Sequence, residues 1–160
     1  MKQGIAAGWL AGLLLLTGCG NAVFPYAREM GDMALLRTMG VDAGEAGQQF
    51  QVTVSTGRRA AGLQGENLPP LILSAQAGSL SAACLSIQGL SDSYVFYGYV
   101  DQLLVGEDAA LTGIEPVLDY FSRDAELSLG AQLWLVRGDT ARTAIESGEE
   151  AGVEGRLSTL

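Results

Sequence analysis

The pattern of apolar and polar residues in the second half of the chain predicts a strand, a helix and another strand. Apolar runs rich in β-branched and aromatic residues occupy 94–105 and 131–136. Runs this short and apolar are typical of strands that are covered on both faces. Between them, apolar residues recur at steps of three and four and share one helical face: Ile114, Val117, Leu118 and Phe121. Thr112 and Glu115 have the spacing of a capping box for this helix, and Pro116 suits its first turn.

The first half of the chain predicts a hairpin, a further strand and a second helix. A strand over 35–41 and an alternating strand over 50–55 flank a loop that contains glycines, which is the pattern of a hairpin. Residues 71–77 predict another strand. Ser79 is placed to cap a helix whose apolar residues share one face: Leu80, Ala83, Cys84 and Ile87.

A last helix is predicted after Gly138, with Asp139 as its N-cap and three residues facing inward: Ala141, Ala144 and Ile145. Strands and helices in this order predict a single α/β domain over 34–147, with a mixed β-sheet of about four to six strands and packed helices. Residues 148–160 form a polar tail rich in glycine and glutamate. We interpret this tail as a linker to further domains or as the end of a shortened chain.

The first eighteen residues have the features of a lipoprotein signal peptide. Lys2 gives a positive start, and the apolar run over 5–16 is shorter than the roughly 20 residues that a spanning helix needs. Leu16-Thr17-Gly18-Cys19 resembles a bacterial lipobox, in which the cysteine thiol takes the lipid. We therefore expect a signal peptide over 1–18, a lipidated Cys19 and a membrane tether over 19–33. An ordinary signal peptide or a membrane-buried helix is the alternative.

Lipidation of Cys19 would leave Cys84 as the second of two cysteines, and we expect it to be a small buried hydrophobic residue. A Cys19–Cys84 disulfide is the alternative for an exported protein whose Cys19 is unmodified.

Charge and residue types exclude several classes of function. The formal charge is −9, which repels phosphate backbones, so no nucleic-acid partner is expected. The chain has no histidine, which removes Ser-His-Asp and Cys-His nucleophiles and the commonest metal ligand. We predict no catalytic, cofactor or metal site. The acids Asp119, Asp124 and Glu126 are candidates for acid–base chemistry, but Asp119 and Arg123 have ion-pair spacing on a helix, which favours a structural role.

Three residues are predicted to contact a partner: Arg58, Arg59 and Tyr99. The first two belong to a predicted loop over 58–70, and Tyr99 lies in the aromatic strand. In a continuous strand, residues 94 and 96 would face away from residues 97 and 99, so we expect sheet core plus one exposed tyrosine. Asp42 ends a strand, where a turn residue is favoured over a ligand.

Several of these segments together resemble the N-terminal domain of the Ger(x)C family, the lipoprotein C subunit of spore germinant receptors. The resemblance rests on these stretches: 40–42, 97–98, 103–107, 118–124 with Glu126, and 136–138. It implies a non-enzymatic subunit that works with integral-membrane A and B subunits in the response to nutrient germinants. It also implies a location on the outer face of the spore's inner membrane, with no cofactor, and further domains after this one.

Two other classes remain open from the sequence. An exported solute-binding lipoprotein would need an apolar pocket with a few convergent polar groups. A carboxylate-based hydrolase would need two acids that face each other across a cleft, about 5–9.5 Å apart.

Overall fold

A five-stranded mixed sheet forms the centre of the computed structural model, which describes residues 32–47, 49–57, 59–61 and 66–148. The sheet has the order β6-β3-β2-β8-β9. Its strands are β2 (Thr38–Ala43), β3 (Phe50–Ser55), β6 (Ile72–Ala77), β8 (Gln102–Gly106) and β9 (Gln132–Val136). The β2–β3 and β3–β6 pairs are antiparallel, whereas β8 pairs in parallel with β2 and β9. The predicted α/β class, mixed sheet and hairpin are confirmed.

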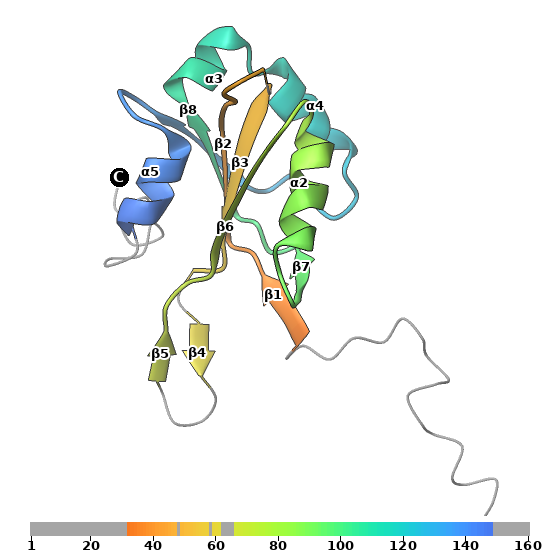
Figure 1. The fold of residues 1–160 in the computed structure, drawn as a ribbon, viewed down its shortest axis with the longest axis vertical. Helices are drawn as coiled ribbons and strands as arrows, with labels where there is room; N and C mark the ends of the chain where they lie inside the picture. Colours follow the sequence, from red (N-terminus) through yellow and green to blue (C-terminus); the bar gives the residue numbers. More distant parts are fainter. Residues whose placement is uncertain (1–31, 48, 58, 62–65, 149–160) are drawn as a thin grey trace, which may run out of the picture. The chain divides into compact units, whose positions relative to one another are not determined.

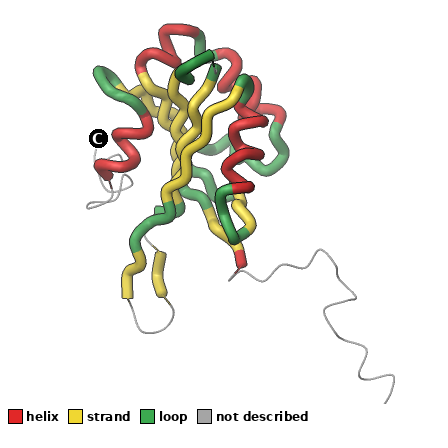
Figure 2. The backbone as a smooth tube through the Cα atoms, in the orientation of Figure 1, coloured by secondary structure: helices red, strands yellow, loops and turns green. Residues whose placement is uncertain are grey.

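Helices cover the two faces of this sheet unequally. On one face lie α2 (Leu80–Gly89) and α4 (Glu115–Arg123), and on the other lies α5 (Ala141–Ser147), as Figures 1 and 2 show. The short helix α3 (Glu107–Thr112) follows β8 directly. The larger apolar core lies under α2 and α4, and a smaller cluster around Leu104 lies under α5. No helix in the described part of the chain is long and apolar enough to cross a bilayer.

The two predicted strands over 35–41 and 94–105 are each interrupted. A short parallel pair, β1 (Met33–Leu35) with β7 (Tyr94–Phe96), precedes the longer pair of β2 with β8. Two residues separate β1 from β2, whereas residues 97–101 separate β7 from β8 and form a turn. The amide of Val100 donates to the carbonyl of Tyr97 at 3.0 Å in this turn. We call residues 97–101 the bulge turn.

The predicted loop over 58–70 contains a short hairpin instead, so that prediction is wrong in part. Strands β4 (Arg59–Ala61) and β5 (Glu66–Leu68) pair in antiparallel register. Gly62 and Gly65, which indicated a loop, come between these strands in the sequence. Glycines between two short runs are also what a hairpin connection uses.

The helix ends confirm one predicted cap and correct two. The amide of Ala82 donates to Ser79 Oγ at 3.2 Å, as predicted for the start of α2. Thr112 does not cap α4, because it ends α3 and its hydroxyl donates to the carbonyl of Asp108. The N-cap of α5 is Thr140 rather than Asp139, since Thr140 Oγ1 accepts from the amide of Thr143.

The predicted inner face of α4 is correct except at one position. Val117 and Phe121 are buried, Ile114 packs partly against the core, and Pro116 lies in the first turn. Leu118, however, is 44% exposed. The sheet beneath α4 is too narrow to cover that side of the helix, because β9 is the last strand.

Candidate functional site

The structure describes only part of the predicted contact and lipidation residues. Cys19 and Arg58 lie outside the described residues, and Arg59 begins β4 with a side chain that is not described. Tyr99 lies in the bulge turn and is 54% exposed. These positions remain predictions, with Tyr99 placed on the surface.

The bulge turn brings Tyr99 back onto β7. The rings of Phe96 and Tyr99 meet edge to face, with centroids 5.8 Å apart. The expectation that residues 96 and 99 face opposite sides of one strand is therefore wrong, because the strand ends at Phe96. Gly98 makes the return possible, since a Cβ there would lie 2.5 Å from Phe96 Cζ.

Cys84 is a free, buried thiol, as expected of a small hydrophobic residue. Tyr97 donates its hydroxyl to the Cys84 carbonyl at 3.3 Å, which joins the bulge turn to α2. Burial raises the pKa of the Cys84 thiol, and the hydroxyls of Tyr120 and Tyr97 bonded to the thiol oppose this shift. Burial also raises the pKa of both tyrosines. At neutral pH this cluster is thus an uncharged support for the core, without a thiolate nucleophile.

The three acids around the end of α4 hold local structure. Arg123 Nε donates to Asp119 Oδ1 at 2.7 Å, which confirms the predicted ion pair on the helix surface. Asp124 Oδ1 accepts from the amide of Glu126, and Glu126 Oε1 accepts from the Tyr94 hydroxyl at 3.0 Å. Each of these carboxylates therefore has a structural partner.

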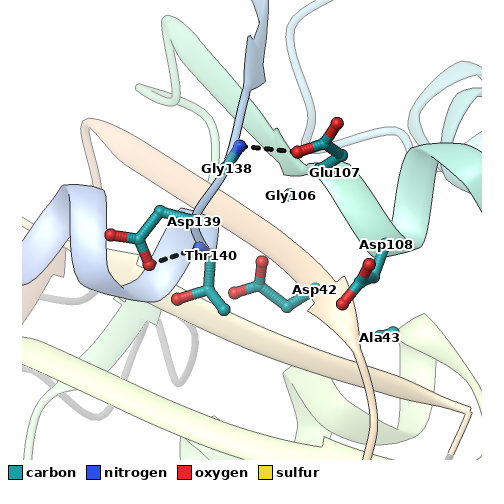
Figure 3. Close-up of a pocket in the computed structure, with 8 residues that line it drawn as sticks. All are labelled: Asp42, Ala43, Gly106, Glu107, Asp108, Gly138, Asp139 and Thr140. Atoms are coloured by element: carbon teal, nitrogen blue, oxygen red, sulfur yellow. Dashed lines mark hydrogen bonds between the residues drawn. The ribbon is translucent and has the colours of Figure 1, made fainter.

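A pocket of about 300 Å³ lies where the parallel strands β2, β8 and β9 end (Figure 3). The carboxyl ends of parallel strands are the usual position for binding sites in open α/β sheets. Eight residues line the pocket: Asp42, Ala43, Gly106, Glu107, Asp108, Gly138, Asp139 and Thr140. The sequence did not bring these acids together, because they come from three segments far apart in the chain.

Asp42 is the buried member of this group and acts as a second cap for α5. Its carboxylate accepts from the amides of Ala141 and Arg142 at 2.7 and 2.9 Å. Asp42 is therefore a strand residue that fastens a distant helix, and the prediction of a turn role is wrong. Burial raises the pKa of Asp42, whereas the two amide bonds lower it. Gly106 has to be a glycine here, since a Cβ would collide with Asp42 Oδ1.

Two other acids of the pocket bind the chain between β9 and α5. The Gly138 amide donates to Glu107 Oε2 at 2.6 Å, and the Thr140 amide donates to Asp139 Oδ1 at 2.7 Å (Figure 3). No group of three or more acids or cysteines among the described residues is arranged to hold a metal ion. Asp42, Glu107 and Asp139 thus position α5 and the segment before it.

A wider groove of about 540 Å³ lies between the start of α2 and one flank of α4. Its apolar members include Phe50, Leu80 and Tyr120, and its polar members include the Asp119–Arg123 pair. Pockets of this size are within the range for small ligands, about 300–1,000 Å³. It is the hollow in the described chain that best suits the solute-binding alternative.

The sheet order, the one-sided helix pair and the acid-lined strand ends define the chain as a small α/β domain with a mixed sheet. A family model described as "Spore germination protein N-terminal domain" matches residues 26–152. The match spans most of the sequence, so the chain belongs to this family of spore germination proteins. The resemblance to the Ger(x)C N-terminal domain is confirmed. No curated protein and no solved structure matches the chain.

Proposed function

We propose that this chain belongs to a lipid-anchored, non-enzymatic subunit of a nutrient germinant receptor. It is held on the outer face of the spore's inner membrane and works through contacts with the integral-membrane A and B subunits. The family match over residues 26–152 is the observation that carries this proposal. The structural roles of Asp42, Glu107 and Asp119 agree with it, because these carboxylates are engaged in holding the fold.

The anchor in this proposal is Cys19. Thirteen residue steps separate it from Asp32, where the described structure begins, and an extended chain of that length reaches at most about 45 Å. The domain is therefore kept within one domain diameter of the lipid headgroups. Two acyl chains, at about 0.8 kcal/mol per buried CH₂, hold a protein of this size firmly.

Replacement of the anchor cysteine tests this part of the proposal. Cys19→Ala should leave the signal peptide uncleaved, and globomycin-type inhibition of lipoprotein processing should give the same longer product in the wild type. The mass of the N-terminal peptide and its lipid label are the measurements. Cys84→Ala is the matched control and should be lipidated normally. Normal processing of the Cys19→Ala chain would contradict the anchor.

Association with the receptor is tested separately. Tagged wild-type chain, solubilised from spore membranes, should co-purify with the integral-membrane receptor subunits, identified by their peptide masses. Retention of the lipid label without either subunit would leave the anchor in place and overturn the receptor role.

The groove beside α4 supports one alternative, an exported solute-binding lipoprotein. Titration calorimetry with amino acids and sugars on the purified chain distinguishes the two functions. Saturable binding that Tyr120→Ala abolishes, together with the absence of receptor subunits, would favour the solute-binding function.

A further inference from the structure

Strand β9 is apolar on both faces but is covered on only one. Trp134 and Val136 pack against the small cluster beneath α5. Leu133 and Leu135 alternate with them, point to the opposite face and are 48% and 56% exposed. Their neighbours in register on β8, Leu103 and Val105, are buried. A parallel strand is normally covered on both faces, so one helix-sized cover is missing over β9.

Two further leucines border this uncovered face. On α4, the residues Asp119, Tyr120 and Arg123 line the groove towards α2. At about 100° per residue, Leu118 lies on the opposite flank. On α3, which packs beside β9, Leu111 follows Glu107 by one turn, and Glu107 binds the amide of Gly138 just past β9. Leu111 is 80% exposed. We call Leu111, Leu118, Leu133 and Leu135 the leucine surface.

The segment that carries this surface is strongly acidic. Residues 107–131, which connect β8 to β9, hold six carboxylates and one arginine, a net charge of −5. The arginine, Arg123, is paired with Asp119. Glu115 is exposed and lies beside Leu118 on the same flank of α4. Strand β9 itself carries no charge between Gln132 and Val136.

From these features we infer that the leucine surface is the docking site for an amphipathic helix of another protein, with an apolar stripe flanked by lysine or arginine. A helix laid over β9 beside α4 would continue the layer of α2 and α4 and cover Leu133 and Leu135. Apolar anchors surrounded by complementary charge are the common form of helix-in-groove recognition. This inference rests on the proposed function, and the helix belongs to an integral-membrane receptor subunit.

The test compares co-purification of the receptor subunits from spore membranes for the tagged full-length chain and its variants. Leu133→Glu and Leu135→Glu should each lower recovery of the subunits by about tenfold or more, as expected when a central apolar anchor is lost. Leu133→Thr keeps a strand-forming residue and should still lower recovery. Leu85→Glu is the matched control, because Leu85 is 74% exposed on α2 and lies outside the surface. It should leave recovery unchanged.

Charge and self-association provide the remaining measurements. Glu115→Lys should weaken recovery less than the leucine variants, and the difference from wild type should shrink as salt is raised. The purified chain should sediment as a monomer. A dimer that Leu135→Glu abolishes would overturn the inference by assigning the surface to a second copy. Equal recovery of wild type and leucine variants would also overturn it, whereas wild-type chain without receptor subunits would overturn the proposed function instead.

Discussion

Asp42 shows how a single buried carboxylate can be structural in a chain whose acids first suggest chemistry. It is 4% exposed and accepts two amide hydrogen bonds from the first turn of α5. Its nearest close neighbour is Gly106, where no side chain fits. The sequence could place Asp42 at a strand end, but could not identify Ala141 as its partner, 99 residues away.

Asp42→Ala should lower the free energy of unfolding by about 1–3 kcal/mol, because two amides at the start of α5 lose their acceptor. Asp139→Ala is the control, since Asp139 is exposed and binds only the next residue, and it should change stability by no more than about 0.5 kcal/mol. Chemical denaturation at pH 7 provides both values. Equal effects of the two variants would contradict the role of Asp42.

The pH dependence of stability should also change in a defined direction. Burial raises the folded-state pKa of Asp42 above its unfolded value of 3.8, so the folded state binds more protons between these two values. The contribution of Asp42 to stability is therefore greatest below the unfolded pKa and falls as pH rises through the folded pKa. Asp42→Ala removes this contribution, and the stability gap to wild type should widen as pH is lowered from neutral towards 3.8.

At the scale of elements, the bulge turn between β7 and β8 is the largest departure from the predicted strands. The apolar run over 94–105 indicated one strand, yet the backbone leaves the sheet after Phe96 and returns at Gln102. Arg37 binds Asp101 at 2.7 Å where the ladder resumes. Periodicity could not reveal the break, because Tyr97 and Val100 are as apolar as strand residues and only Gly98 marks a turn.

Gly98→Ala should destabilise the domain by about 1–3 kcal/mol, because the new Cβ displaces the Phe96 ring and the edge contact with Tyr99. Gly89→Ala is the matched control at the end of α2, where a Cβ meets nothing within 4 Å. That control should be neutral or stabilise the chain by up to about 1 kcal/mol. Thermal unfolding measures both, and an unchanged melting temperature for Gly98→Ala would disprove this account of the turn.

At the scale of the whole molecule, element order predicted more than the surface did. The α/β class, the β2–β3 hairpin and the inner faces of α2 and α5 follow from periodicity, which reports burial along a single element. The half-covered state of β9 does not, because Leu133 and Trp134 read alike in sequence and differ only in what packs above them. The pocket at the strand ends was likewise hidden, since its acids meet only through tertiary pairing.

The remaining predicted contacts belong to this scale because they concern assembly. Arg58→Glu with Arg59→Glu should reduce recovery of the receptor subunits without changing the melting temperature, as rim charges act on association rather than on folding. Arg142→Glu is an unsuitable control because Arg142 pairs with Glu146. Arg156→Glu is therefore used instead. If the double variant assembles like wild type, the 58–70 segment is not a contact surface.

The fastening of α5 by Asp42 also bears on the order in which the molecule is completed. A chain synthesised from its N-terminus presents β2 long before Ala141 exists, so the Asp42 carboxylate stays hydrated while the sheet assembles. Closing so long a loop is entropically costly and slow. Until α5 docks, the side of the sheet at Gly40, where Ile145 and Ala141 later pack, is open to water. The last seven helical residues of the domain thus decide when half of its sheet becomes dry.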